Sequence, residues 1–299
     1  MQQPGFTVVI PAYNYAHCVE RAVRSVLAQD YPLLQCLVIN DGSKDNTLEV
    51  LRDLQQQGLA FDLVDQANAG LAAVRNRGID EARYDWLVFL DADDEMLPGA
   101  LACYAAAIAT QPDAALVIGA HESVFDDGRV RRVTPAILPA SAADRLHAYL
   151  FKHLSIANGA CAMHRRCFDH LRYRAGMRQS EDVPVFAHVL AHYPVTTLDE
   201  PVARIYKHAD SMRHDTEQAL IIGMQLEQVI FEESGLPEWA ASLRRRYRAR
   251  RALSLVKHCY RGGDYQAVIR FWHEAFRTAP FAALAPRYLR RYLSSLVKR

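Results

Sequence analysis

Short apolar runs alternate with helical patterns over the first 120 residues, and this alternation most strongly limits the folds open to the chain. The apolar runs are rich in β-branched and aromatic side chains and occupy residues 6–10, 34–39, 61–64, 86–90 and 114–118. Helical patterns fill the intervals at residues 16–29, 45–57, 70–83 and 98–110. Strands that alternate with helices of this length form right-handed βαβ units. We therefore predict an α/β domain with a Rossmann-like, mostly parallel sheet and flanking helices, whose ligands bind beyond the carboxyl ends of the strands.

The pattern changes after residue 120. Residues 121–134 predict a hairpin around an Asp-Gly turn, and residues 182–192 predict a helix. We also expect a helix at 141–153 and extended segments at 156–163 and 195–206. Because no long linker interrupts this part, we expect residues 1–215 to form one domain, with halves at 1–120 and 121–215.

The helical, Arg-rich pattern of the remaining residues, 216–299, predicts a helical C-terminal extension. Residues 255–280 resemble a single tetratricopeptide unit, with a Gly-Asp turn between two helices. One repeat is too short for a solenoid, so we expect a helical hairpin that covers the main domain or mediates dimerisation.

Charge is strongly segregated along the chain, although the formal net charge is only +1. Residues 1–120 carry 7 basic and 16 acidic side chains, whereas residues 241–299 carry 15 basic and 2 acidic ones. The C-terminal region therefore faces an anionic partner, or it packs against the acidic body of the chain.

The final segment, residues 287–299, has apolar side chains at helical spacing beside five basic ones. A basic amphipathic helix of this kind binds anionic membrane surfaces. The alternative is that its apolar face, with Leu289, Tyr292, Leu293 and Leu296, packs on the preceding hairpin or on a second subunit.

Several protein classes are disfavoured by what the sequence lacks. The six cysteines contain no CxxC pair, no apolar run approaches a membrane span, and the first residues do not resemble a signal peptide. We expect a cytoplasmic protein, at most peripheral at the inner face of the membrane, that binds no nucleic acid. The first strand is followed by neither GxGxxG nor GxxxxGK, which argues against a dinucleotide oxidoreductase and a P-loop NTPase.

Polar segments follow four of the predicted strands at the edge where a ligand would bind. They read PAYN, NDGSKDNT, NAGLAAVRNRG and DADD, and begin at Pro11, Asn40, Asn68 and Asp91. Three carboxylates within four residues, Asp91, Asp93 and Asp94, repel one another unless they are solvated or face a cation. Oxygen ligands of this kind suit Mg²⁺ or Mn²⁺. The alternative is a capped start of the helix predicted at 98–110.

Other residues of these segments also allow two interpretations. Asp41 can accept hydrogen bonds from a base or a ribose, or it can stabilise an Asx turn. Tyr13 can stack on a base or pack in the core. Arg75 can face a phosphate or form a surface salt bridge.

The strings VVIPAYN, LVINDGSKDNT, NAGLAAVRNRGI and WLVFLDADD, in this order and spacing, resemble family 2 glycosyltransferases. The resemblance covers about residues 5–210. It implies the GT-A fold and an inverting transfer of a sugar from a nucleotide-diphosphate donor, with UDP the usual nucleotide, assisted by a divalent cation, Mn²⁺ or Mg²⁺. The implied acceptor is a glycan or a lipid-linked oligosaccharide of bacterial surface polysaccharide synthesis.

The resemblance also implies roles for individual residues. Asp182, in the Glu-Asp pair that begins a later helix, is the expected general base; simple N-capping by Ser180 or Asp182 is the alternative. The expected metal residues are Asp93, Asp94 and His208, the last from the segment IYKHADSMRH. The expected nucleotide-sugar residues are Pro11, Ala12, Tyr13, Asn14, Asp41, Gly70, Arg75, Asn76, Asp91, Ala92 and Glu181.

Two competing functions remain at this point. A nucleotidyltransferase also uses an α/β sheet and Mg²⁺, but PAYN occupies the place of its usual glycine-rich loop. A catalytically idle scaffold would be expected to lose an acidic residue of the site, yet Asp91, Asp93 and Asp182 are all present.

Overall fold

A nine-stranded sheet organises the molecule, with strand order β3-β2-β1-β4-β8-β6-β9-β5 and β7 paired to β6. The computed structural model describes residues 3–177, 179–207 and 220–298. Six strands, β1 to β4, β6 and β9, point the same way, and the other three run against them. The strands are β1 (Phe6–Ala12), β2 (Leu34–Asp41), β3 (Asp62–Gln66), β4 (Trp86–Phe89), β5 (Glu95–Met96), β6 (Leu116–Phe125), β7 (Val130–Val133), β8 (Cys161–His164) and β9 (Val195–Lys207).

Helices cover both faces of the sheet, so its central strands are apolar on both sides. Along β1, Val8 and Ile10 belong to one apolar cluster, and Val9 belongs to the other. The helices of the sheet domain are α1 (Val19–Leu27), α2 (Thr47–Gln56), α3 (Leu71–Glu81), α4 (Ala100–Thr110), α5 (Ala142–Leu150) and α6 (Asp182–His192), with 3-10 turns η1 (Asn158–Ala160) and η2 (Arg165–Phe168).

The predicted α/β architecture is confirmed, and each of the five predicted strands overlaps one of β1 to β4 and β6. The order of strands differs from a simple βαβ succession. β8 inserts antiparallel between β4 and β6, and the two-residue β5 pairs with β9 at Arg204. The segment predicted as extended at 156–163 contains the 3-10 turn η1 at Asn158–Ala160, and only its last residues form a strand, β8.

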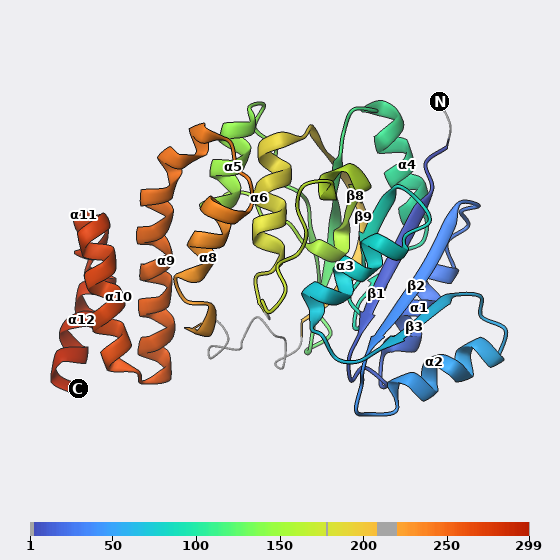
Figure 1. Cartoon of the computed structure of the whole chain (residues 1–299), viewed down its shortest axis with the longest axis horizontal. Coiled ribbons are helices and arrows are strands. Elements are labelled where there is room, and N and C mark those ends of the chain that lie inside the picture. The colour runs from blue at the N-terminus through green and yellow to red at the C-terminus, as the bar shows by residue number, and fades with distance from the viewer. Residues whose placement is uncertain (1–2, 178, 208–219, 299) are drawn as a thin grey trace.

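The C-terminal helices lie at the end of the molecule opposite to β1, β2 and β3 (Figure 1). Their elements are α8 (Gln225–Gln228), the π-helical turn η4 (Val229–Glu233), the 3-10 turn η5 (Glu238–Ala240), α9 (Ala241–Gly262), α10 (Tyr265–Thr278), α11 (Pro280–Ala283) and α12 (Pro286–Lys298). The predicted hairpin is formed by α9 and α10: Gly263, with φ of 77°, ends α9, and the Asp264 side chain caps α10.

Two apolar clusters divide this region. Leu226, Ile230 and Tyr247 belong to the core of the sheet domain, whereas α9 beyond residue 252 packs with α10 in a separate cluster. The domain boundary predicted at residue 215 falls outside the described residues and stays a prediction.

The amphipathic tail forms α12, and its apolar residues divide between two environments. Leu289 and Tyr292 pack against the α9–α10 cluster, and the Tyr292 ring stacks on Trp272 with centroids 4.0 Å apart. Leu293 and Leu296 remain exposed. The predicted apolar face of this helix is therefore only partly covered: Leu289 and Tyr292 pack on the hairpin, and Leu293 and Leu296 face outward.

A close approach between α3 and β1 depends on Gly78. A Cβ atom added there would lie 2.6 Å from Cγ1 of Val9, far inside van der Waals contact. Glycine weakens a helix interior, so its place in α3 reflects this contact with the sheet.

We expect Gly78→Ala to lower the free energy of unfolding by about 1–3 kcal/mol, because overpacking forces the helix away from the strand. Urea denaturation measures the change. Gly262→Ala is the matched control, since nothing lies within 4 Å of its added Cβ. Equal effects of the two substitutions would contradict this packing argument.

Candidate active site

The polar segments that follow β1 and β2 are joined by hydrogen bonds. The backbone N–H of Asn14 donates to Ser43 Oγ at 3.0 Å, and Asn14 Oδ1 accepts from the N–H of Lys44 at 2.7 Å. Asn14 has φ of 62°, which Asn tolerates better than most residues. Pro11 and Ala12 are buried in β1, whereas Tyr13 beside them is 38% exposed. Tyr13 therefore does not pack in the core, and its ring is available at the edge of the sheet.

Asp41 organises the segment that follows β3. One of its oxygens accepts from Gln66 Nε2 and the Ala69 N–H, at 2.7 and 2.9 Å. The other accepts from Asn68 Nδ2 and the Gly70 N–H, at 3.2 and 2.8 Å. Asp41 thus holds the turn that precedes α3, in which Gly70 has φ of 87°. Its role with a base or ribose stays a prediction.

The acidic cluster after β4 brings Asp91, Asp93 and Asp94 together, with one ligand atom of each within 4.8 Å of the others. Asp94 is buried, and its Oδ1 accepts from the N–H of Tyr206 at 2.9 Å. Burial, with Asp91 and Asp93 nearby, raises the pKa of Asp94 well above the usual 3.8. Ala92 between them is buried. The alternative of a helix start is wrong, because α4 begins only at Ala100, and Glu95 lies in β5.

These three carboxylates fit a hard divalent cation. They supply oxygen ligands only, which Mg²⁺ and Mn²⁺ prefer over nitrogen or sulfur, and their mutual repulsion falls when a cation binds. The third predicted metal residue, His208, lies outside the described residues.

Arg75 connects this cluster to the start of α6. Its guanidinium is buried, pairs with Glu181, and contacts Asp91 with Nη2 to Oδ1 of 3.3 Å. It also lies over the Tyr173 ring at 5.4 Å. Arg75 is therefore no surface salt bridge, and its predicted role toward a phosphate stays a prediction. The neighbouring Asn76 uses both polar atoms on the Tyr173 backbone, at 2.8 and 2.9 Å.

Asp182 is the first residue of α6, and Glu181 is its N-cap residue without a capping side-chain hydrogen bond. The helix dipole favours an ionised carboxylate there, whereas burial disfavours it. Burial prevails and raises the pKa of Asp182, while Arg75 and then Lys152 oppose that rise. Burial likewise raises the pKa of Glu181, against the effect of Arg75. A carboxylate with a raised pKa is a stronger proton acceptor once it is ionised.

Sequence reasoning missed two basic residues of this site. Lys152 follows α5 with φ of 65°, and its charge acts on Asp182 from 30 positions away in the chain. Arg21 of α1 donates to the carbonyl of Asp93 at 2.5 Å and pairs with Glu95 at 3.1 Å. Single basic residues in the first turn of a helix or just after a helix are common on protein surfaces. Neither Arg21 nor Lys152 therefore stood out in the sequence.

The chain matches the family model described as Glycosyl transferase family 2 over residues 7–172, which is more than half of its length. It is 38% identical over 92 residues to the uncharacterized glycosyltransferase YibD of Escherichia coli, covering 31% of this chain and 27% of that protein. It is 34% identical over 100 residues to a Campylobacter jejuni protein, GalNAc(5)-diNAcBac-PP-undecaprenol beta-1,3-glucosyltransferase, covering 33% of this chain and 32% of that one. The matches thus span less than a third of these relatives.

Solved structures share the fold at low sequence identity. Staphylococcus aureus TarS 1-349, in complex with UDP-GlcNAc, aligns with a TM-score of 0.62 and 16% identity, over 98% of this chain and 79% of that one. The Pyrobaculum calidifontis mannosyltransferase PcManGT, in complex with GDP-Man and Mn²⁺, aligns with a TM-score of 0.58 and 18% identity. The alignment covers 100% of this chain and 86% of that one. The fold is of the GT-A type. With the family match, these findings establish that the chain belongs to glycosyl transferase family 2.

The effect of burial and of neighbouring charges on the pKa of Asp182 can be measured directly by titration. A carboxyl whose pKa is raised by burial should lose its proton above the usual pH of 3.8. In Lys152→Gln a cation that favours the ionised form is removed, so the proton should leave at still higher pH. NMR of protein carrying ¹³C-labelled aspartate carboxyls, with the Asp182 signal assigned by its loss in Asp182→Asn, follows this step.

Arg261→Gln, which removes an exposed cation at the end of α9, serves as the control and should leave the titration of Asp182 unchanged. A lower or unaltered Asp182 pKa in Lys152→Gln would show that Lys152 does not act on this carboxylate.

Proposed function

We propose that this protein is an inverting glycosyltransferase that moves a sugar from a nucleotide-diphosphate donor, with UDP as the favoured nucleotide. The sugar is transferred to a hydroxyl of a glycan or lipid-linked acceptor in bacterial surface polysaccharide synthesis. One observation carries the proposal: a single buried arginine, Arg75, joins the acidic cluster at the end of β4 to the Glu181–Asp182 pair at the start of α6. A cation-binding cluster and a proton acceptor are the two parts that an inverting transfer requires.

The comparisons support the reaction class and the kind of donor. Besides relatives with glycosyltransferase names, a poly-beta-1,6-N-acetyl-D-glucosamine synthase of Staphylococcus epidermidis is 38% identical over 93 residues, which cover 31% of this chain and 22% of that protein. The structural neighbours are recorded with UDP-GlcNAc and with GDP-Man. In this proposal the exposed Tyr13 and the turn held by Asp41 receive the nucleoside, beside Pro11 and Asn14.

Asp182 is the general base of the proposed reaction. It takes the proton of the acceptor hydroxyl while the acceptor oxygen bonds to the anomeric carbon, and the bond from that carbon to the donor diphosphate breaks on the opposite face. Arg75 keeps Glu181 in place beside the base. A divalent cation held by Asp91, Asp93 and Asp94 would offset the negative charge on the diphosphate. General-base help of this kind is worth about 10²- to 10⁴-fold in rate.

Two substitutions test the base and the metal site separately, the first through turnover and the second through UDP binding. Asp182→Asn should lose about 10²- to 10⁴-fold in turnover because it removes the base, and it should still be stabilised by UDP with Mn²⁺ in a thermal melt. Asp93→Ala should weaken UDP binding more in Mn²⁺ than in EDTA. Turnover is measured over a panel of nucleotide sugars.

Near wild-type turnover of Asp182→Asn would refute the base assignment, and equal weakening of Asp93→Ala in Mn²⁺ and EDTA would refute the metal site. Wild-type protein that UDP does not stabilise in either condition would favour an idle scaffold. Incorporation of a nucleotide instead of a sugar would favour the nucleotidyltransferase alternative.

We further propose that the C-terminal helices dock on an anionic membrane from the cytoplasmic side. None of the described helices combines the length and apolarity that a bilayer span requires. Several apolar side chains in and between α11 and α12 are exposed: Phe281 is 92% and Val297 87% exposed, and Leu284, Leu293 and Leu296 are exposed as well. Exposed Arg287, Arg290 and Lys298 on α12 add positive charge. Apolar insertion beside basic residues favours anionic lipid headgroups, and docking brings the site to a lipid-linked acceptor.

Co-sedimentation with phosphatidylglycerol vesicles at low salt measures this docking. We expect the wild-type protein to sediment and the double variant Phe281→Ser and Val297→Ser to remain in the supernatant, because the inserted apolar area is lost. Ile137→Ser is the matched control, since Ile137 is 97% exposed but lies on the sheet domain. Equal sedimentation of all three proteins, or a dimer of the wild-type protein that the double variant abolishes, would contradict membrane docking.

A further inference from the structure

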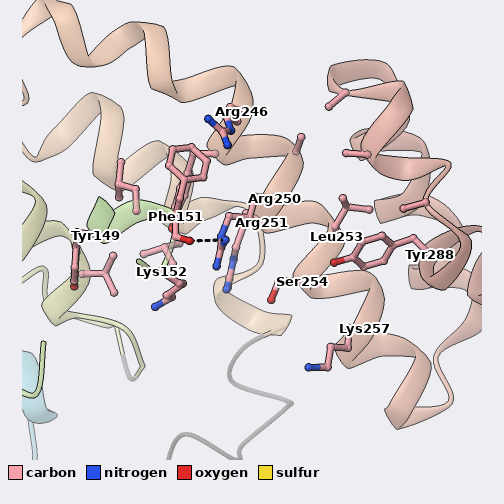
Figure 2. Close-up of a pocket in the computed structure, with 18 of the residues that line it drawn as sticks. Tyr149, Phe151, Lys152, Arg246, Arg250, Arg251, Leu253, Ser254, Lys257 and Tyr288 are labelled. Atoms are coloured by element: carbon pink, nitrogen blue, oxygen red, sulfur yellow. Dashed lines mark hydrogen bonds between the residues drawn. The ribbon is translucent and has the colours of Figure 1, made fainter. Parts of the chain in front are cut away.

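A pocket of about 660 Å³ lies where the sheet domain meets the C-terminal helices. Its walls come from the end of α5, from one side of α9, and from the start of α12 (Figure 2). The volume is in the range of sites that hold small molecules. Among the described residues, none of those to which the family resemblance gave a role lines it.

Six basic side chains line this pocket, and no acidic side chain does so among the described residues; the six are Lys152, Arg246, Arg250, Arg251, Lys257 and Arg287. On α9, Arg246 and Arg250 are four residues apart, and Lys257 follows two turns later, so they share one side of the helix. Like charges at this spacing destabilise a helix. The arrangement therefore carries an electrostatic cost that a bound anion would remove.

Several of these cations are positioned by contacts with uncharged groups, namely backbone carbonyls and an aromatic ring. Arg250 donates to the carbonyl of Phe151 at 3.0 Å, the hydrogen bond drawn in Figure 2. Arg251 donates to the carbonyl of Gly223 at 2.9 Å, and the Arg246 guanidinium lies 4.6 Å from the centre of the Phe151 ring. Burial lowers the pKa of both Lys152 and Arg251, so a bound anion would favour the charged form of each side chain. The site is thus shaped for negative charge before any ligand binds.

The pocket adjoins the proposed base. Ser180 and Val183, which line it, flank the Glu181–Asp182 pair on either side. Lys152 belongs to the pocket, and its charge also acts on Asp182. A ligand here therefore lies on the side of the site that receives the acceptor, away from the nucleoside segments after β1 and β2.

We propose that this pocket binds a phosphate or diphosphate group carried by the acceptor, such as the diphosphate that joins a glycan to a lipid carrier. The inference rests on the proposed glycosyltransferase function and adds the class of acceptor. Arginine recognises phosphate oxygens through paired hydrogen bonds, and lysine adds a further charge. An anchored diphosphate holds the acceptor glycan beside Asp182.

The test uses inorganic pyrophosphate as the probe, with the full-length protein in EDTA and saturating UDP. Isothermal titration calorimetry should show binding that UDP does not displace. The double variant Lys257→Gln and Arg287→Gln should bind pyrophosphate at least about tenfold more weakly, because a single lost charge-assisted contact is already worth that factor. Both side chains are exposed, so the variant is expected to fold.

The matched control is the double variant Arg261→Gln and Arg290→Gln, which removes the same charge from α9 and α12 outside the pocket. It should bind pyrophosphate as the wild-type protein does. Equal weakening in both double variants, or displacement of pyrophosphate by UDP, would overturn the proposal.

Phosphatidylglycerol vesicles distinguish the source of the phosphate. If the pocket variant loses vesicle binding but keeps pyrophosphate binding, Lys257 and Arg287 act only in membrane docking and the pocket proposal is wrong. Stabilisation by UDP in Mn²⁺, measured on the same proteins, reports separately on the proposed donor site. A pocket that fails with the donor site intact leaves the glycosyltransferase proposal standing.

Discussion

The buried Arg75 guanidinium is the interaction on which the candidate site depends. It originates from α3, pairs with Glu181 at the start of α6, and contacts Asp91 at the end of β4. Without this cation, carboxylates from two distant parts of the chain, the end of β4 and the start of α6, would repel one another. Removing one member of a buried ion pair costs about 3–5 kcal/mol, because it leaves an uncompensated charge. Arg75 thus allows an acidic cluster and a proton acceptor to share one edge of the sheet.

The charge segregation of the chain has a clear structural counterpart. The acidic N-terminal part places its carboxylates at the end of β4, where they fit a cation. The basic C-terminal part does not simply neutralise that body. Some of its arginines pair with acids near α8, as Arg244 and Arg248 do with the buried Glu227. Others surround a pocket that no acidic residue lines among those described. The two sides of Asp182 thus differ in how they can receive an anionic group: the acidic side through a bound cation, and the basic side directly.

The sequence supported more of the fold than of the contacts. The strands, the helices and the α9–α10 hairpin follow local patterns, so hydrophobic period and turn chemistry predict them. The insertion of β8 between β4 and β6 was not predictable, because strand order depends on long-range packing. The same holds at single residues. Asp41 suits an Asx turn by type, but its four donors come from residues 66–70.

The residue types of the site and their positions at strand ends were determined by the sequence itself, because a parallel strand that ends in polar residues presents them at one edge of the sheet. Tertiary structure alone decided how these groups act on one another. It buried Arg75, raised the pKa of Asp182 by removing water, and brought Lys152 within range of that carboxylate. It also turned the basic helix α9 toward the end of α5 to form a pocket. Electrostatic effects depend on distance and burial in space, and neither quantity is encoded in the local pattern of a chain.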